Sequence, residues 1–418
     1  MADVQWRAHD VGELRIDFLL RSLQCLAQSL AQLGIPLHVI SAPTFQDAPE
    51  ALHRLCRTRG AVAVHLNAEY PLNERRRDAA VLERLQDSGV RCFVTHGTVL
   101  RPPSEIRTGA GKPYTVFTPF RKRWFDSLPA GAFEPLPAPK PVGPPVEVVE
   151  IAGAGEDGFW KAGESQAQRV LTRFIRKRRD GYAIQRDFPG ESGTSALSPY
   201  LAVGAISPRQ CAAALARFED PRDSQWMTEL IWREFYRHVV HSFDHVSMGQ
   251  AFRREYDAVV WEQDETAYAA WKAGRTGYPL VDAGMRQLAA TGWMHNRVRM
   301  VTAMFLSKHL LLDWRLGERH FMQQLVDGDF ASNNGGWQWS ASTGTDAVPY
   351  FRIFNPTTQG KRFDANGTYV RRWVPELAEV PDKYLFEPLK WQALADYPAP
   401  IVDHATARLR AIERFKAL

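Results

Sequence analysis

The chain has 418 residues, of which 45% are hydrophobic and 24% charged, and its formal net charge is +5. These values describe an ordinary soluble globular protein with two or three domains and a substantial core. No apolar run reaches membrane-spanning length and the N-terminus lacks a signal pattern, which argues against a membrane or secreted protein and makes the cytoplasm the expected compartment.

The side chains that most often bind metals are not arranged as ligand sets. The four cysteines are scattered without a CxxC pair, which argues against a disulfide framework and a thiolate site. His238 and His241 have HxxH spacing but no acidic or cysteine partner at ligand spacing, so we expect helix-surface residues and no metal. The surplus of cations is a mild hint of a polyanionic partner.

Helical and strand patterns alternate in the first third of the chain. Short apolar strands separated by helices predict a parallel, doubly wound α/β sheet. The chain opens on a helix with no strand before it, so this sheet is expected to lack its first strand. The expected elements are helix 13–33, strand 35–41, helix 46–58, strand 61–67, helix 73–86 with Asn73 as its cap, and strand 90–96.

Residues 128–147 are dense in Pro, Gly and Ala and predict a linker, beyond which only helical patterns follow. We therefore expect an α/β domain over 1–127, a linker over 128–163 and an all-α domain over 164–418. The first helix, 164–179, has an apolar stripe with most of its cations off it, and Ser198 and Ser207, each before a proline, are typical N-caps. The stripe consists of Ala167, Val170, Leu171, Phe174 and Ile175.

Two glycine-rich stretches resemble nucleotide-binding motifs and are rejected. IAGAGEDGF (151–159) contains GxGxxG, but Glu156 and Asp157 would repel a pyrophosphate and no second strand with a ribose-binding carboxylate follows. TGAGKP (108–113) has too short a glycine spacing for a phosphate loop, and Pro113 stands where a magnesium-binding hydroxyl is needed.

Four stretches of the helical half combine rings, charges and hydroxyls. TSALSP (194–199) places three hydroxyls at a helix start, which is a possible phosphate site. ELIWREFYRH (229–238) puts an acid, a ring, a cation and a phenol on one helix face, which suits a flat base beside phosphates. The helix in TGWMHNRVRM presents Asn296, Arg299 and Met300 on one face, and LVDGDFASNNGGWQW (325–339) adds two aspartates, Asn333 and two tryptophans.

These residues carry a resemblance to a known family. GTSALS, ELIWREFYRH, TGYPLVDAGMRQL, TGWMHNRVRM, DGDFASNNGGWQW, STGTDAVPYFRIFNPTTQGKRFD and YVRRWVPEL resemble the photolyase/cryptochrome family. They are most similar to its folate-type (class I) cyclobutane pyrimidine dimer photolyases. The resemblance implies an antenna-type α/β domain and a helical domain that binds FAD, with light-driven repair of dimers in damaged DNA by electron transfer from reduced FAD.

Roles follow from the resemblance wherever the letters match. FAD would be held by Tyr182, Thr194, Ser195, Ala196, Leu197, Ser198, Arg299, Asp327, Gly328, Asp329 and Asn333, with Arg299 paired to Asp327 and Asn333 opposite the flavin N5. The flipped lesion would meet Glu229, Asn296 and Met300, between the aromatic walls Trp232 and Trp339, with Arg233 and Tyr236 on the same helix face as Glu229. The DNA backbone would be contacted by Arg186, Arg297, Arg352 and Gln359. An electron relay would run from Trp337 through Trp314 to Trp261.

His9, Asn73 and Glu74 match folate-contacting positions, so a 5,10-methenyltetrahydrofolate antenna is a further expectation. QWRAHD (5–10) aligns with the segment after the family's first strand and helix, which leaves that strand out of the expected sheet. A monomeric repair enzyme is the leading reading. A light-sensing cryptochrome without repair activity is the alternative, and a dehydrogenase resting on the GxGxxG stretch comes third.

Overall fold

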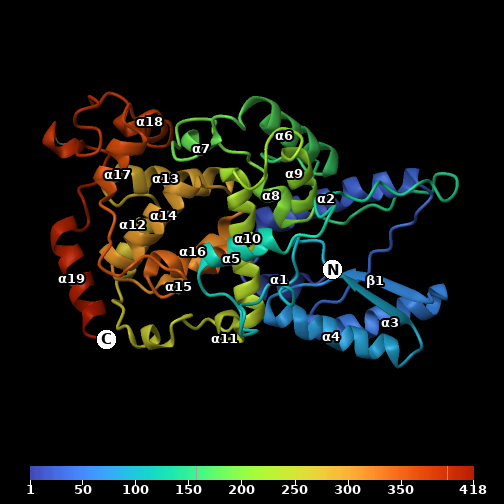
Figure 1. Cartoon of the computed structure of the whole chain (residues 1–418). Coiled ribbons are helices and arrows are strands. Elements are labelled where there is room, and N and C mark those ends of the chain that lie inside the picture. Colours follow the sequence, from blue (N-terminus) through green and yellow to red (C-terminus); the bar gives the residue numbers. More distant parts are fainter. Residues whose placement is uncertain (157, 393) are drawn as a thin grey trace. The chain divides into compact units, whose positions relative to one another are not determined.

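The structure is a computed structural model that describes residues 1–156, 158–392 and 394–418. The chain packs into two compact units (Figure 1). The first unit contains residues 1–177, 195–247 and 326–331, and the second contains residues 178–194, 248–325 and 332–418.

The first unit holds a small parallel sheet. Strand β1 (Ala63–Asn67) pairs with β2 (Arg91–Thr95), and Ala63 lies opposite Arg91. Helix α4 (Leu72–Gln86) connects the two strands, and α3 (Ala48–Arg59) packs against α4. This confirms the parallel α/β pattern expected between residues 46 and 96. Cys56, Val81, Leu85 and Val90 form a buried hydrophobic cluster in this part.

The strand expected over 35–41 is wrong, and among the described residues the sheet has two strands. An extended segment becomes a strand only when a neighbouring strand pairs with its backbone. Here the first residue of the chain occupies these groups, because the Met1 ammonium donates to the Ile40 carbonyl and Ala42 N–H donates to the Met1 carbonyl. Pro36 also lacks an N–H for a ladder.

Two of the three expected helix caps are corrected. Helix α4 begins at Leu72 after Pro71, so Asn73 lies inside its first turn and does not cap it. Ser198 is the first residue of α8 (Ser198–Ala202), whose cap position is Leu197. Ser207 does cap α9 (Pro208–Leu215), in a reciprocal capping box with Gln210.

The described residues between 128 and 163 contain neither helix nor strand, as the linker composition predicts. No helix follows the GxGxxG stretch until Glu164, which leaves it without the helix N-terminus that a dinucleotide site requires. Asp157, which entered the argument against that site, lies outside the described residues.

One long helix, α10 (Gln225–Ser242), packs against α5 (Phe117–Asp126) and α11 (Asp244–Ser247), and α6 (Glu164–Lys177) packs against α9 and α2 (Glu13–Gln32). Helix α6 buries Ala167, Leu171, Phe174 and Ile175, which confirms its predicted stripe apart from the half-buried Val170. Phe174 contacts Trp226 of α10 at 4.7 Å between ring centroids. Another helix of this unit is α1 (Asp3–Ala8).

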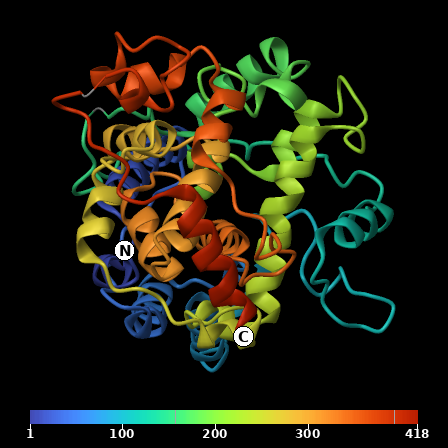
Figure 2. The same cartoon turned by 90° about the vertical axis from the view of Figure 1, so that its left-hand side faces the viewer.

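The second unit is helical throughout its described regular elements. Its helices are α7 (Tyr182–Gln185), α12 (Glu265–Lys272), α13 (Pro279–Thr291), α14 (Asn296–Met304), α15 (Trp314–Gln324), most of α16 (Phe330–Ala341), α17 (Pro356–Phe363), α18 (Thr368–Trp373) and α19 (His404–Lys416). Helix α13 packs against α14, α17 and α18, and α19 packs against the π-helical turn Phe305–His309 that follows α14 (Figure 2).

Asp282 on α13 anchors loops of the second unit from a fully buried position. Its carboxylate accepts hydrogen bonds from the backbone N–H and hydroxyl of Thr276, from Gly277 N–H and from the Tyr397 hydroxyl. Burial raises the pKa of this carboxyl, and the hydrogen bonds oppose that shift.

In neither unit is any described helix long and apolar enough to cross a membrane.

Candidate functional site

The first half of α10 presents an acid and a ring side by side. Gln225 Nε2 donates to Glu229 Oε1 at 2.8 Å, one helical turn apart, which orients the Glu229 carboxylate. The Trp232 indole stacks on Phe117 of α5, with 3.6 Å between centroids and 8° between planes. Both Glu229 and Trp232 remain half-buried. Phe117, which sequence reasoning missed, therefore fixes the orientation of the expected lesion-pocket wall.

The next charged residue of α10, Arg233, points into the first unit. Its guanidinium donates to the Thr98 carbonyl at 2.7 Å and to the Leu201 carbonyl at 3.0 Å. Burial lowers the pKa of Arg233 to about 9. Two donors of Arg233, which was expected at the DNA, therefore hold two backbone segments that are distant in the sequence, and its contact with DNA stays a prediction. Tyr236, also expected at the lesion, lies half-buried with its ring 5.6 Å from that of Trp232.

The acidic segment that precedes the two tryptophans belongs to the first unit up to Ala331. Asp329 Oδ1 accepts a hydrogen bond from Arg237 of α10 at 2.6 Å, and Asp327 is 7% exposed. Gly328 between them is also buried. Charged groups at this depth are costly unless they are paired, so Arg237 fixes where this segment can lie.

A second arginine serves the same acidic segment from α2. Burial lowers the pKa of Arg15, and the carboxylates of Asp329, Glu69, Asp327 and Glu74 raise it in part. One guanidinium is thus in the field of two expected flavin residues and one expected folate residue. Arg15 lies outside every motif quoted above, and Arg237 lies within ELIWREFYRH but had no role assigned to it, because its partner Asp329 is far along the chain.

The residues of the TSALS stretch are divided between the two compact units. Thr194 closes a segment of the second unit and its carbonyl accepts from Arg178 at 3.4 Å, while residues 195–198 belong to the first unit. Ala196 has a φ of +55°, a left-handed conformation that turns the backbone sharply just before α8. Helix α8 has only five residues, so its dipole is a weaker anion attractor than the sequence suggested.

In the second unit, Tyr182 begins α7 and is buried, with the Arg186 guanidinium 5.7 Å from its ring centre. Helix α14 exposes Asn296 and leaves Met300 half-buried, and Arg299 Nε donates to the Met294 carbonyl at 2.7 Å. The expected face of α14 is therefore present.

Arg297, expected at the DNA backbone, already has partners within the second unit. It forms an ion pair with Asp187 at 2.8 Å and lies 4.4 Å from the ring centre of Phe363. An arginine whose charge is met by a carboxylate contributes less to phosphate binding than a free one.

The stretch NNGGWQWSA, which contains two tryptophans among small and polar residues, is helical and forms part of α16. Asn333 Nδ2 donates to the Glu318 carbonyl of α15 at 2.9 Å, and Asn334 Nδ2 donates to the Glu318 carboxylate at 3.3 Å. Trp337 is 2% exposed and Trp339 is half-buried. The two asparagines therefore tie this helix to α15 and set the depth of the rings.

The three tryptophans of the expected relay belong to one hydrophobic cluster of the second unit. Trp314 and Trp337 are buried in it, and Trp261 packs against it from a partly exposed position. A Cβ added to Gly317, one turn after Trp314, would lie 2.1 Å from the Trp337 ring, so the Trp337 indole rests directly on α15. Trp271, which sequence reasoning did not single out, has its ring 6.0 Å from that of Trp337.

The remaining expected residues lie on helix ends and surfaces. Arg352 is exposed, and Gln359 on α17 has a buried side-chain oxygen that has no hydrogen-bond partner among the described residues. His9 is exposed just after α1, Asn73 is exposed on α4, and Glu74 is half-buried beside it. The expectation that His238 lies on a helix surface is wrong, because this residue of α10 is 4% exposed and its Nε2 hydrogen-bonds the Arg101 carbonyl at 2.8 Å.

Comparisons with known proteins identify the family of the chain. The DNA photolyase family model matches residues 1–141, and the model of the FAD-binding domain of DNA photolyase matches residues 226–417. The chain belongs to the DNA photolyase family.

Individual relatives place the chain more closely within it. It is 44% identical to a deoxyribodipyrimidine photo-lyase of Salmonella typhimurium, over 99% of this chain and 90% of that one. A class III photolyase structure from Agrobacterium tumefaciens aligns with a TM-score of 0.86 and 39% identity, covering 97% of this chain and 89% of that one. A Synechocystis cryptochrome aligns with a TM-score of 0.82 and 28% identity, covering 96% and 88%.

The side chains on either unit have the chemistry that FAD requires. In the first unit, paired carboxylates at Asp327 and Asp329 offer acceptors for ring N–H groups, and the hydroxyls of residues 195 and 198 offer donors for phosphate. In the second, the Asn333 amide nitrogen is used by a backbone carbonyl, which fixes the rotamer of its side-chain oxygen. These donor and acceptor sets fit a flavin dinucleotide.

The contact between Gly317 and Trp337 yields a stability prediction. We expect Gly317→Ala to lower the free energy of unfolding by about 1–3 kcal/mol, because the added methyl collides with the Trp337 indole and overpacks the cluster. Chemical denaturation followed by tryptophan fluorescence measures this. Gly109→Ala is the control, since nothing lies within 4 Å of the added methyl. Equal stability of the two variants would show that the indole does not rest on α15.

Proposed function

We propose that the chain is a deoxyribodipyrimidine photo-lyase, an enzyme that uses light to split cyclobutane pyrimidine dimers in DNA. The observation that carries the proposal is the arrangement on α10, where Glu229 is held by Gln225 and Trp232 is backed by Phe117. A carboxylate beside a rigid ring suits a flipped base pair, because it offers an acceptor for base N–H groups and a surface for stacking. Photo-lyase relatives matching 99% of the chain support the same activity.

Bound FAD, when reduced and excited by light, supplies the electron that opens the cyclobutane ring and takes it back afterwards. The chain's own residues bind and orient the lesion. Glu229 hydrogen-bonds the flipped bases, and Trp232 stacks against them with Phe117 preventing its rotation. For Trp339, Asn296 and Met300 of the second unit, a contact with the lesion is what the family resemblance implies. A dimer is poorly stacked in the duplex, so extruding it costs only a few kcal/mol.

Flavin contacts are proposed for each unit by itself. In the first unit, Arg237 orients the Asp329 carboxylate, which together with Asp327 accepts from the flavin ring. In the second unit, Arg299 is a flavin contact that the family resemblance implies. Residues 194–198 and Tyr182 hold the dinucleotide, with the turn at Ala196 bringing backbone close to it. Asn333 presents its amide oxygen to the flavin N5.

DNA beyond the lesion is held electrostatically. Arg186 and the exposed Arg352 contact phosphates, and Gln359 supplies a polar contact. Arg297 contributes less, because Asp187 neutralises it. In this proposal residues 1–127 form the antenna-type domain, 128–163 the linker and 164–418 the part that binds FAD and DNA, in a monomer acting in the cytoplasm.

The repair activity is tested with a purified, photoreduced protein and an oligonucleotide containing one thymine dimer. Blue light should restore the intact thymines, measured by chromatography. Glu229→Ala should weaken binding of the dimer about ten- to hundredfold, as expected for loss of a charged hydrogen bond, while flavin absorbance is kept. Flavin absorbance without any loss of lesion in the wild-type protein would favour a light-sensing cryptochrome.

The tryptophan relay gives a second prediction. Trp337, Trp314 and Trp261 carry electrons inward from the surface to the flavin, so Trp337→Phe should slow photoreduction of the oxidised cofactor about tenfold or more. Repair by chemically reduced protein should remain. Trp271→Phe is the matched control, since its ring lies 6.0 Å from Trp337 in the same cluster but outside the relay. Equal slowing in both variants would contradict the assigned path.

The folate antenna is a separate proposal, based on His9, Asn73 and Glu74 and on the Arg15 guanidinium near Glu74. Protein reconstituted with 5,10-methenyltetrahydrofolate should show an absorbance band beyond those of flavin, and Glu74→Ala should lose it. Asp87→Ala, an exposed change just after the same helix, should keep the band. A wild-type spectrum accounted for by flavin alone would contradict the antenna.

A further inference from the structure

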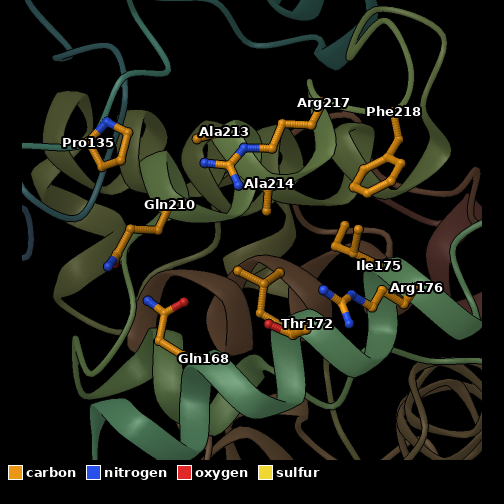
Figure 3. Close-up of a pocket in the computed structure, with 11 residues that line it drawn as sticks. Pro135, Gln168, Thr172, Ile175, Arg176, Gln210, Ala213, Ala214, Arg217 and Phe218 are labelled. Carbon is orange, nitrogen blue, oxygen red and sulfur yellow. The ribbon is translucent and has the colours of Figure 1, made fainter.

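Helices α6 and α9 of the first unit border a groove that none of the residues assigned above line. Its cavity volume is about 310 Å³. Figure 3 shows Gln168 and Gln210 at one end of the groove and Arg176 and Phe218 at the other. The floor between them is apolar, and it consists of Leu171, Ile175, Ala213 and Ala214.

Cations gather around this groove. Arg169, Arg173, Arg176 and Lys177 extend along about 12 Å of α6, and Arg217 faces them from the end of α9. No salt bridge in the described part of the chain involves Arg173, Arg176 or Lys177, and the same holds for Arg217.

A merely solvated helix face would usually carry acids one turn from its cations. Helix α6 has a single acid, Glu164, at its opposite end, and its cations at spacings of three and four residues repel one another. The dipole of α6 explains the two cations of its last turn, and that of α9 favours Arg217 at its C-terminal end, but neither dipole explains Arg169 or Arg173. Two acids, Glu219 and Asp220, follow Phe218 and reduce the positive charge without cancelling it.

The shape of the groove indicates which class of anion it can bind. Phe218 is 56% exposed at the rim, and the floor below it is made of small and branched apolar side chains. A positively charged groove with an exposed ring is how proteins bind a nucleic acid strand, with phosphates on the cations and a base against the ring. The Gln168 amide offers a donor and an acceptor to a base edge, and Gln210, whose Oε1 already accepts from Ser207, offers the donors of its Nε2. An acidic peptide would use the cations but bring no flat group for the ring and floor.

We propose that the α6–α9 groove binds a single strand of DNA, independently of the lesion and of flavin chemistry. The presence of DNA as a partner rests on the proposed function, but strand binding here does not require repair. Phosphates pair with Arg173, Arg176 and Arg217, since guanidinium groups bind phosphate oxygens through paired N–H donors. One base stacks on Phe218.

The test is the affinity of the FAD-loaded protein for an undamaged, fluorescent oligothymidine, measured in the dark by anisotropy over a range of salt. The triple variant Arg173→Ala, Arg176→Ala, Arg217→Ala should bind about tenfold more weakly at moderate salt, and the slope of log K against log salt should fall by about 2, at roughly 0.7 for each lost contact. The matched control removes Arg57, Arg59 and Arg91, which are equally exposed in the first unit, and should change affinity and slope far less.

Phe218→Ala provides an independent variant, which should weaken binding about tenfold with an unchanged salt slope, because it removes stacking and no charge. The proposal is overturned if the triple variant behaves like its control. It is also overturned if the triple variant keeps oligothymidine affinity while losing affinity for polyglutamate, which would identify an acidic protein as the occupant.

Repair of a short dimer-containing oligonucleotide separates this proposal from the proposed function. The triple variant should repair it at the wild-type rate. Absence of repair in the wild-type protein, with oligothymidine binding still dependent on the groove, would refute the photo-lyase assignment and leave the strand site standing.

Discussion

The first unit depends on the charged residues that α10 turns inward. Glu234, 2% exposed, accepts from Leu100 N–H, Arg101 N–H and Trp124 Nε1, each within 2.8 Å. One residue before it, Arg233 binds two carbonyls, and one turn later Arg237 binds Asp329. A buried charge that loses its partner costs several kcal/mol, so each of these contacts fixes a segment that is distant in sequence.

Helix α10 therefore both fixes distant segments of the first unit and positions the candidate lesion residues, and the two roles constrain each other. Its inward charges determine the rotation of α10, and that rotation determines where Glu229 and Trp232 face, because residues three and four apart lie on one side of a helix. The acidic segment 326–331 is fixed by the same helix through Arg237. The candidate lesion residues and the candidate flavin carboxylates of the first unit are thus positioned by one set of buried ion pairs and hydrogen bonds.

Sequence reasoning predicted those elements whose pattern is local. The stripe of α6, the βαβ unit from 61 to 96 and the shared face of α14 follow from periodicity alone, and the family motifs identified the residues on α10 and α16. Sequence reasoning failed where a residue far along the chain determines the structure or the role of a segment. The segment 35–41 is apolar enough for a strand but has no strand partner among the described residues, and only its Ile40 carbonyl contacts Met1. Arg15, Arg237 and Phe117 were missed because each acts only through residues far along the chain.

The arginines of the chain carry the same charge but differ in whether their side chains already have partners within the protein. Arg233, Arg237 and Arg297 look in the sequence like a basic patch, yet carbonyls and carboxylates already occupy their donors. Those of α6 stand exposed beside an open groove, with no carboxylate paired to Arg173 or Arg176 in the part of the chain that is described. A formal charge of +5 is therefore a poor guide to where an anion binds. Cations that form no ion pair or hydrogen bond within the protein remain available for a ligand. By this criterion α6 is a better candidate for binding an anionic strand than α10, the helix that carries the family motif.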